Sequence, residues 1–401
     1  MTYGPIEMVV LQGTSYCNLN CNYCYLSEAS RRNSQSMSIE TIEAAFRAIF
    51  DSPFLGRKLR VSWHSGEPFV MKPAYYREAI ETIDNLRRNS SREDLHVDFD
   101  FQTNGTLVND AWISFFKEYD GRATLGISCD GPAALHDRHR KNWSGKASHA
   151  ATENGMKMLG DAGIDFDITA VVSPDGLDHP DEFISYFEPF SDSIREFHFN
   201  LHDEFFISPE DTDLIESYAS RYQRFLTRLL ETMSAPGRRY PKIRNFSSFY
   251  NRLFVPETDR PHYDARSMCA PFKTISIEMN GDVTTFYAGL TLDECRDLKD
   301  LYDDDRGFVI GNILKQNLEE IANSAKLGMI ERDFDTSHSA CERSCEYYDV
   351  CSGGYNLIKY RRFGNFDSTE TPECKVHVKA FADTVLAHIE DELAAHKSVA
   401  Q

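Results

Sequence analysis

Six apolar segments rich in β-forming residues alternate with helical patterns through the first half of the chain. The segments read IEMVVLQ, LRVSWHS, HVDFDFQT, ATLGIS, FDITAVV and EFHFNL, between residue 6 and about residue 202. Stretches with a 3.6-residue period separate them, such as SIETIEAAFRAIF and AYYREAIETIDNLRR. Strands that alternate with helices indicate βα units and a mostly parallel sheet. We therefore expect an α/β fold, a partial (β/α)6 TIM-like barrel with its site at the C-terminal ends of the strands.

The pattern changes in the second half of the chain. PEDTDLIESYASRYQRFLTRLLETM, from residue 209, reads as one long amphipathic helix, and VHVKAFADTVLAHIEDELAAH closes the chain as another. Between them a region with little periodicity holds six of the ten cysteines, as expected where metal replaces part of a core. The sequence thus predicts a barrel at 1–208, a helical connector at 209–265, a cysteine-rich domain at 266–376 and a C-terminal helix at 377–401.

Charge and hydropathy restrict the class of protein. The sequence contains no apolar run of about 18 residues, so we expect no membrane span. The first residues lack the basic and apolar regions of a secretory signal, which favours the cytoplasm, where thiols stay reduced. Ten cysteines in that compartment indicate ligands or catalysts rather than disulfides. The net charge of −20 argues against binding to nucleic acid.

Three cysteines, Cys17, Cys21 and Cys24, follow the first predicted strand within eight positions. They can be read as buried structural thiols or as part of a zinc site, but structural zinc takes four protein ligands. A [4Fe–4S] cluster has four irons, so three cysteine ligands leave one iron free to bind another group. The spacing therefore favours a cluster.

The segment CNLNCNYC resembles the signature of radical S-adenosylmethionine (SAM) enzymes, in which the free iron chelates the amino and carboxylate groups of SAM. Tyr23, before the last cysteine, fits that pattern. WHSGEP at 63–68 is similar to the Gly-Gly-Glu-Pro segment of the family, with Ser65 in place of the first glycine. The resemblance implies that Gly66 lets backbone approach the cofactor and that Glu67 holds its ammonium group.

Three further segments, QTNGTL (102–107), GISCDGP (126–132) and LHDRHR (135–140), lie where related enzymes place cofactor contacts. Each residue taken singly is more often a turn or cap residue. The resemblance makes the following residues candidates for binding SAM: Thr103, Asn104, Ser128, Asp130 and Arg140. Arg140 is the candidate for the methionine carboxylate, because a guanidinium suits bidentate pairing with that group.

The C-terminal segments CERSCEYYDVCSGGY and TPEC look like the SPASM extension of peptide- and protein-modifying members of the superfamily, which in full form holds two auxiliary clusters. The resemblance makes four cysteines the complete ligand set of one auxiliary cluster: Cys341, Cys345, Cys351 and Cys374. Phe286 and Tyr355 stand where ligands of the other cluster are usual, so we expect one catalytic and one auxiliary [4Fe–4S] cluster. Zinc is the competing occupant, since four thiolates also suit zinc.

The remaining three cysteines receive no ligand role. Cys269 looks like an orphan of the lost cluster, and Cys129 and Cys295 read as buried thiols, the usual state of free cysteine.

Family chemistry implies reductive cleavage of SAM to methionine and a 5′-deoxyadenosyl radical, with an electron donor such as flavodoxin or ferredoxin. An auxiliary cluster suits reactions in which the substrate radical then loses an electron. In sulfatase-activating relatives an aspartate acts as general base where this chain has Tyr287. Tyr355 and Arg361 join Tyr287 as candidate neighbours of the substrate.

Several segments look instead like peptide maturases that act on glycine-rich-repeat ribosomal precursors and form cyclophanes: YGPIEMVVLQGTSYCNLNCNYCYL, SPFLG, TTFYAG and FGNFDSTETPEC. The resemblance implies a carbon–carbon bond between an aromatic ring and the β-carbon of a nearby residue in a precursor peptide. Thioether formation, epimerisation and formylglycine formation in a sulfatase remain alternatives, as does a non-enzymatic iron–sulfur scaffold. The first predicted strand begins at about residue 6, so we expect the peptide leader to bind the barrel, the C-terminal region or a separate leader-binding protein.

Overall fold

The computed structural model describes residues 3–92, 94–202, 208, 210–256, 269–302 and 304–399, the last five of these by their backbone alone. Residues 209, 265 and 266, which bound the predicted connector, lie outside the described residues. Contacts between Cα atoms divide the chain into two compact units: Met1–Ser128, His139–Phe166 and Ser267–Asp333 form the first, and Cys129–Arg138, Asp167–Arg266 and Phe334–Gln401 form the second. Each unit is assembled from separate stretches of the chain, and the linear division into four parts stays a prediction.

The first unit is built on a sheet with the strand order β4-β3-β2-β1-β7-β8-β9. Its strands are β1 (Ile6–Leu11), β2 (Leu55–Trp63), β3 (His96–Thr103), β4 (Ala123–Ser128), β7 (Thr274–Ile277), β8 (Asp282–Thr285) and β9 (Gly311–Asn312). Strands β1 to β4 and β7 pair in parallel, and β8 and β9 add in antiparallel fashion. The parallel order and the alternation of strand and helix confirm the predicted α/β class and partial barrel.

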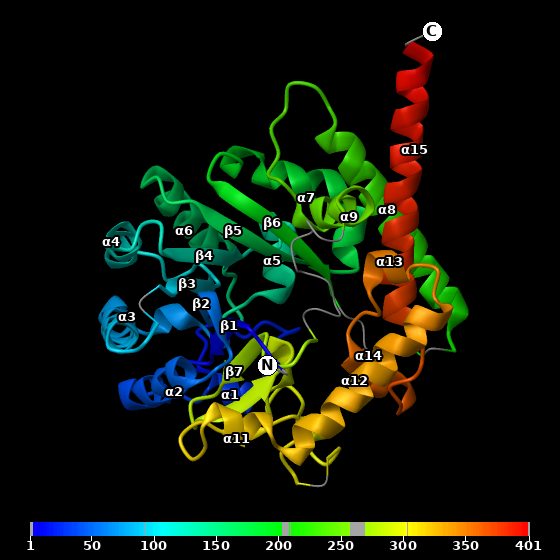
Figure 1. The fold of residues 1–401 in the computed structure, drawn as a ribbon. Coiled ribbons are helices and arrows are strands. Elements are labelled where there is room, and N and C mark those ends of the chain that lie inside the picture. The colour runs from blue at the N-terminus through cyan, green and yellow to red at the C-terminus, as the bar shows by residue number, and fades with distance from the viewer. Residues whose placement is uncertain are drawn as a thin grey trace. The chain divides into compact units, whose positions relative to one another are not determined.

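Helices cover one face of these strands, where Figure 1 shows α2, α3 and α4 side by side. The helices of this unit are α1 (Glu28–Arg31), α2 (Ile39–Asp51), η1 (Pro68–Val70), α3 (Pro73–Arg88), α4 (Asp110–Glu118), α6 (His149–Asp161), η5 (Ala288–Leu290), η6 (Arg296–Leu298) and α11 (Leu318–Ala322); α5 (Ala133–His139) and α12 (Ala325–Ser344) contain residues of both units. Helix α2 begins at Ser38, whose hydroxyl accepts the Thr41 N–H (3.1 Å) as an N-cap. Its apolar residues recur every three or four positions and are buried, as in any helix that packs on a core.

Side chains of β3 alternate between two environments, because successive residues of a strand point to opposite faces. Phe99 and Phe101 are fully buried and stack with Trp63 of β2. On the opposite face Asp100 accepts hydrogen bonds from Ser62 (3.1 Å) and Thr124 (3.0 Å), and Gln102 Nε2 donates to Ser128 Oγ (3.0 Å). The sheet therefore has an aromatic face under the helices and an opposite face that carries hydroxyl, carboxylate and amide groups.

The second unit contains β5 and β6, neighbours in the sheet order, and the remaining helices. Its elements are β5 (Phe166–Val172), η2 (Asp175–Asp178), α7 (Pro180–Phe187), η3 (Glu188–Phe190), β6 (Ile194–Leu201), α8 (Thr212–Met233), α9 (Arg244–Phe254), α13 (Tyr348–Cys351), α14 (Asn356–Phe363), the π-helical η7 (Cys374–Ala380) and α15 (Phe381–Val399). Aromatic rings of α7, β6 and α8 form its core, with Phe183 in contact with Phe197, Phe199 and Phe225. Helix α15 packs along α8 in this unit (Figure 1).

Candidate functional site

The three-cysteine loop follows the C-terminal end of β1. The thiols of Cys17, Cys21 and Cys24 are partly exposed, and they lie close enough for the charges of Cys21 and Cys24 to act on Cys17. The Cys17 sulfur accepts the Leu19 N–H (3.4 Å), so the backbone already stabilises charge on that sulfur. Burial, and after it the Glu67 carboxylate, raises the pKa of the Cys17 thiol to about 12. A bound metal would reverse that preference, because a coordinating thiol is deprotonated.

Arg31 and Trp143 hold this loop in place, and the sequence analysis missed both. Arg31 is 7% exposed and donates to the carbonyl of Leu26 (3.1 Å) and to the side chain of Asn20 (2.6 Å). Its own carbonyl accepts the Cys17 N–H (3.0 Å). Trp143 Nε1 donates to the Cys17 carbonyl (2.8 Å), and its ring lies under the Arg31 guanidinium. No local pattern marks Trp143, because it acts only through tertiary contact.

The turn after β2 carries two residues with left-handed backbone, Ser65 (φ +86°) and Gly66 (φ +60°). A Cβ atom on Gly66 would lie 2.5 Å from the Thr14 carbonyl oxygen and 2.6 Å from that of Tyr16. The next residue, Glu67, donates its N–H to the same Tyr16 carbonyl (2.8 Å). Only glycine fits at position 66, and the close approach fixes the turn against the cysteine loop.

The Glu67 carboxylate is 1% exposed and accepts three hydrogen bonds. Its donors are Thr103 Oγ1 (2.6 Å), the Asn104 N–H (2.7 Å) and the Phe69 N–H (2.9 Å). Burial raises the pKa of Glu67 to about 7, although these hydrogen bonds and the Arg140 charge act in the opposite direction. A bound cation would favour the ionised form of this buried carboxylate, because a nearby opposite charge lowers the pKa of a carboxyl group.

Asn104 links this turn to the cysteine loop. Its Nδ2 donates to Asn18 Oδ1 (2.8 Å) and lies 4.0 Å from the Cys17 sulfur. Thr152 of α6 donates to the Asn104 carbonyl (3.0 Å) and so holds the 103–106 turn from the helix side. Thr103 and Asn104, both predicted contacts of SAM, are therefore brought to Glu67 and Cys17.

Arg140 and Tyr23 meet on the other side of the loop. The Arg140 guanidinium is 7% exposed and lies 5.4 Å from the centre of the Tyr23 ring, in cation–π range. Its charge lowers the pKa of Cys24, although burial is the larger influence and raises it overall. Asp130 belongs to the second unit, where it accepts the Val171 N–H (2.9 Å). All the other predicted SAM-binding residues lie in the first unit.

The residues around the cysteine loop fit a three-ligand cluster and SAM. Three thiols converge, and the glycine turn brings the backbone of residue 66 directly against the cysteine loop. Within the part of the chain that the structure describes, the Ser65 hydroxyl is buried without a hydrogen-bond partner, which is costly unless a bound group satisfies it. The set also offers a buried carboxylate for an ammonium and a buried guanidinium for a carboxylate. An ammonium group and a carboxylate are the two charged groups at the methionine end of SAM.

The second cysteine set lies within the second unit. Cys341 sits in the last turn of α12, Cys345 follows that helix, Cys351 ends α13, and Cys374 begins the π-helix η7. Burial raises the pKa of Cys374 to about 12, and the charges of the other three add to the rise, so the four thiols lie close together. Burial likewise raises the pKa of Cys351. A π-helical turn is a frequent feature of functional sites.

No three histidine, cysteine or carboxylate side chains within the described residues are arranged to hold a single metal ion. A four-iron cluster is larger than one ion and holds its thiolates further apart. Four thiols grouped within one unit fit the cysteine ligation of a [4Fe–4S] cluster in their number and chemistry.

The other predicted residues are placed as follows. Phe286, after β8, is 1% exposed with a left-handed backbone (φ +77°), and Tyr287 next to it is half-buried in the first unit. Tyr355 is 45% exposed, and it and Arg361 of α14 belong to the second unit. The three cysteines without a predicted ligand role are all buried: Cys129, Cys269 and Cys295.

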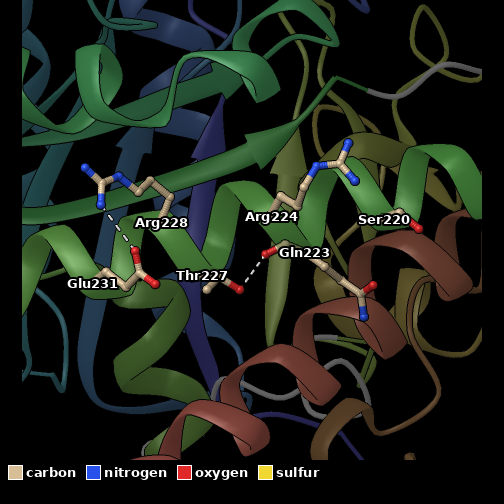
Figure 2. A pocket seen from close by; sticks show the side chains of 6 residues that line it. All are labelled: Ser220, Gln223, Arg224, Thr227, Arg228 and Glu231. Atoms are coloured by element: carbon tan, nitrogen blue, oxygen red, sulfur yellow. Dashed lines mark hydrogen bonds and ion pairs between the residues drawn. The ribbon is translucent and has the colours of Figure 1, made fainter.

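A separate pocket of about 420 Å³ lies on α8, lined by Ser220, Gln223, Arg224, Thr227, Arg228 and Glu231 (Figure 2). All six residues come from one exposed stretch of helix, and Arg228 pairs with Glu231 (3.2 Å). The pocket contains no thiol, so we place the candidate site at the cysteine loop instead. Among the described helices, none is both long and apolar enough to cross a membrane.

Comparison with known proteins identifies the family. Residues 11–187 match the radical SAM superfamily, and residues 269–346 match SPASM, an iron–sulfur cluster-binding domain. An uncharacterised protein of Synechocystis sp., sll1766, is 32% identical over 391 residues, covering 98% of this chain and 94% of the relative. A cysteine-type anaerobic sulfatase-maturating enzyme of Clostridium novyi is 24% identical, over 90% of each chain.

Solved structures share the fold. Native anSMEcpe with bound AdoMet (SAM) superimposes with a TM-score of 0.75 at 20% identity, over 96% of this chain and 98% of that one. Streptococcus suis SuiB bound to the precursor peptide SuiA gives 0.60 at 16% identity, over 93% and 76%. The chain belongs to the radical SAM superfamily and carries a SPASM domain, so its cofactors are SAM, a [4Fe–4S] cluster and auxiliary iron–sulfur in the SPASM domain.

Proposed function

We propose that this chain is a peptide maturase that abstracts hydrogen from a ribosomal precursor peptide and joins an aromatic ring to the β-carbon of a nearby residue. SAM and its cluster supply the 5′-deoxyadenosyl radical, and the bond forms with net loss of two hydrogens from the peptide. One leaves in 5′-deoxyadenosine; the other leaves as a proton, with its electron passing to the auxiliary cluster. We assign SAM binding to the residues around Glu67 and Arg140.

The observation that carries the proposal is the make-up of the two cysteine sets. The second unit groups four thiols, enough for one complete auxiliary cluster, and these are Cys341, Cys345, Cys351 and Cys374. The segment after β8 places Phe286 in the core and Tyr287 beside it, where sulfatase-activating relatives have a ligand and a catalytic aspartate. We therefore propose one auxiliary cluster that serves as an electron acceptor, without an aspartate base at position 287.

The relatives support a peptide or protein substrate. SuiB is a protein solved with a precursor peptide, and anSMEcpe has been solved with a peptide named Cp18Cys. We further propose an electron donor of the flavodoxin or ferredoxin type and a cytoplasmic location, because a reducing compartment keeps ten cysteines as thiols. Leader binding by the chain itself or by a separate protein belongs to the same proposal.

The test is mass spectrometry of a precursor peptide after anaerobic reaction with reconstituted enzyme, SAM and reductant. A product two hydrogens lighter, with its cysteine thiols still free, is expected, and fragmentation should show no cleavage between the joined residues. An unchanged mass would contradict the proposal, and unchanged mass with deuterium uptake at an α-carbon would indicate epimerisation. The variant in which the three N-terminal cysteines are alanine is the inactive control.

Sulfatase maturation is the second candidate. It is favoured by a serine-type anaerobic sulfatase-maturating enzyme of Bacteroides thetaiotaomicron that is 31% identical over 188 residues, 46% of this chain. A sulfatase peptide that gains an aldehyde reactive with a hydrazide probe would favour this candidate over cross-linking.

A further inference from the structure

Lys359 is a buried cation in direct contact with the second cysteine set. The residue is 4% exposed, and its Nζ donates to the Cys341 sulfur at 3.1 Å. A second bond, to the Ser337 carbonyl at 2.7 Å, fixes the ammonium where it is. Lysine is rarely buried without a partner of opposite charge. A thiolate at Cys341, the form in which cysteine ligates a cluster, would supply such a charge.

Helix α14 presents a polar face to the same region. Asn356 lies three residues before Lys359 and therefore on the same side of the helix. It is 0% exposed, and among the described residues neither its Oδ1 nor its Nδ2 has a hydrogen-bond partner. Buried polar groups without partners are costly, so a polar group bound beside this face would lower that cost.

We propose that Lys359 is a positioning residue for the auxiliary cluster, and that its hydrogen bond to Cys341 raises the reduction potential of that cluster. Hydrogen bonds to the sulfurs and local charge are among the main determinants of iron–sulfur potentials. Adding an electron makes the cluster more negative, and a fixed ammonium against one of its sulfurs stabilises that state. The inference rests on the ligand set proposed above, but it does not depend on the peptide product.

Lys379 offers a matched control within the same unit. It also lies near the cluster ligands, since the charges of Cys374 and Cys345 act on it. Its side chain is more exposed, at 28%, and its Nζ pairs with the Glu370 carboxylate at 2.6 Å. Comparing variants of the two lysines therefore distinguishes the effect of a direct hydrogen bond to a sulfur from the effect of a nearby charge that is paired with a carboxylate.

The experiment is a redox titration of the full-length holoenzyme followed by EPR spectroscopy, with SAM added to distinguish the catalytic signal. It is repeated in the variant whose three N-terminal cysteines are alanine. In Lys359→Met the auxiliary midpoint should become more negative by at least a tenfold change in the reduction equilibrium, which is about 59 mV for one electron. Lys379→Met should change it less than threefold. Equal shifts in the two variants, or no shift in Lys359→Met at wild-type iron content, would overturn the proposal.

A measurement on the wild type covers the case in which Lys359→Met fails to load the cluster. Protein labelled with ¹⁵N at lysine Nζ, reduced and studied by pulsed EPR, should show a ¹⁵N coupling to the auxiliary cluster. The coupling should persist in Lys379→Met. Its absence from the wild type would refute a direct bond to the sulfur. Neither readout uses a peptide, so a failed cross-linking reaction leaves this test intact.

Discussion

Replacing Glu67 by glutamine changes one carboxylate oxygen to an amide nitrogen with almost no change in shape. In the wild type one oxygen accepts from Thr103 and the Phe69 N–H, and the other accepts from the Asn104 N–H. All these groups are buried, so an amide nitrogen on either side must face a backbone N–H. One donor loses its partner, at a cost to folding of about 1–3 kcal/mol.

The larger effect is expected on the affinity for SAM. We assign the ammonium of SAM to this carboxylate, and a hydrogen bond to a charged group contributes about 1.5–3 kcal/mol. Since 1.4 kcal/mol corresponds to a factor of ten, the Kd for SAM should rise by about 10- to 100-fold. Anaerobic isothermal titration calorimetry on cluster-loaded protein measures this directly.

Glu278→Gln is the control, because it makes the same chemical change at another largely buried carboxylate of the first unit. Glu278 follows β7 and accepts the Leu292 N–H (3.3 Å). Its SAM affinity should equal that of the wild type. Wild-type affinity in Glu67→Gln, at full iron content, would refute our assignment of the ammonium.

Three further outcomes are expected. Gly66→Ala should lose cluster loading and about 2 kcal/mol or more of stability, because the added Cβ meets backbone atoms. Gly121→Ala has a similar φ and no atom of a described residue within 4 Å of its Cβ, so it should lose only about 1 kcal/mol. Thermal unfolding and iron analysis compare the two variants. Burial raises the pKa of Glu278 to about 7, so the wild type should lose stability as the pH rises from about 4.5 through 7. Glu278→Gln should be more stable than the wild type by about 1–2 kcal/mol at pH 8, and the two should be equally stable below about pH 5. Alanine at all three N-terminal cysteines should reduce about eight irons per chain to about four, measured with sulfide content and Mössbauer spectra; twelve irons in the wild type would refute the single auxiliary cluster.

Much of the fold follows from local pattern. The predicted strands at 96–103, 123–128 and 166–172 match β3, β4 and β5, because alternating or continuous apolar residues there reflect burial directly. Strands β7, β8 and β9 were not predicted. They have two to four residues each, and β7 is specified by its pairing with β1, more than 260 residues away in the chain.

The residues of the candidate site also differ in how far the sequence predicts them. The cysteines and Glu67 carry chemistry in their residue types and spacing, so a motif reveals them. Arg31, Trp143 and Lys359 have ordinary residue types in ordinary segments, and only the folded chain brings them to the cysteines. Residues that tune a site through tertiary contact leave no local signature.

The two cysteine sets differ in the donors that reach their sulfurs, and this difference bears on electron flow. Cys17 receives the neutral Leu19 N–H and lies 4.0 Å from the neutral Asn104 amide. Arg31 directs its donors to carbonyls and to Asn20, and its charge and that of Arg140 act on Cys24. Cys341 receives the ammonium of Lys359. A charged donor stabilises added electron density more than a neutral one does. We therefore expect the catalytic cluster to be the stronger reductant, and the auxiliary cluster to be the better acceptor for the electron that the proposed cross-linking reaction releases.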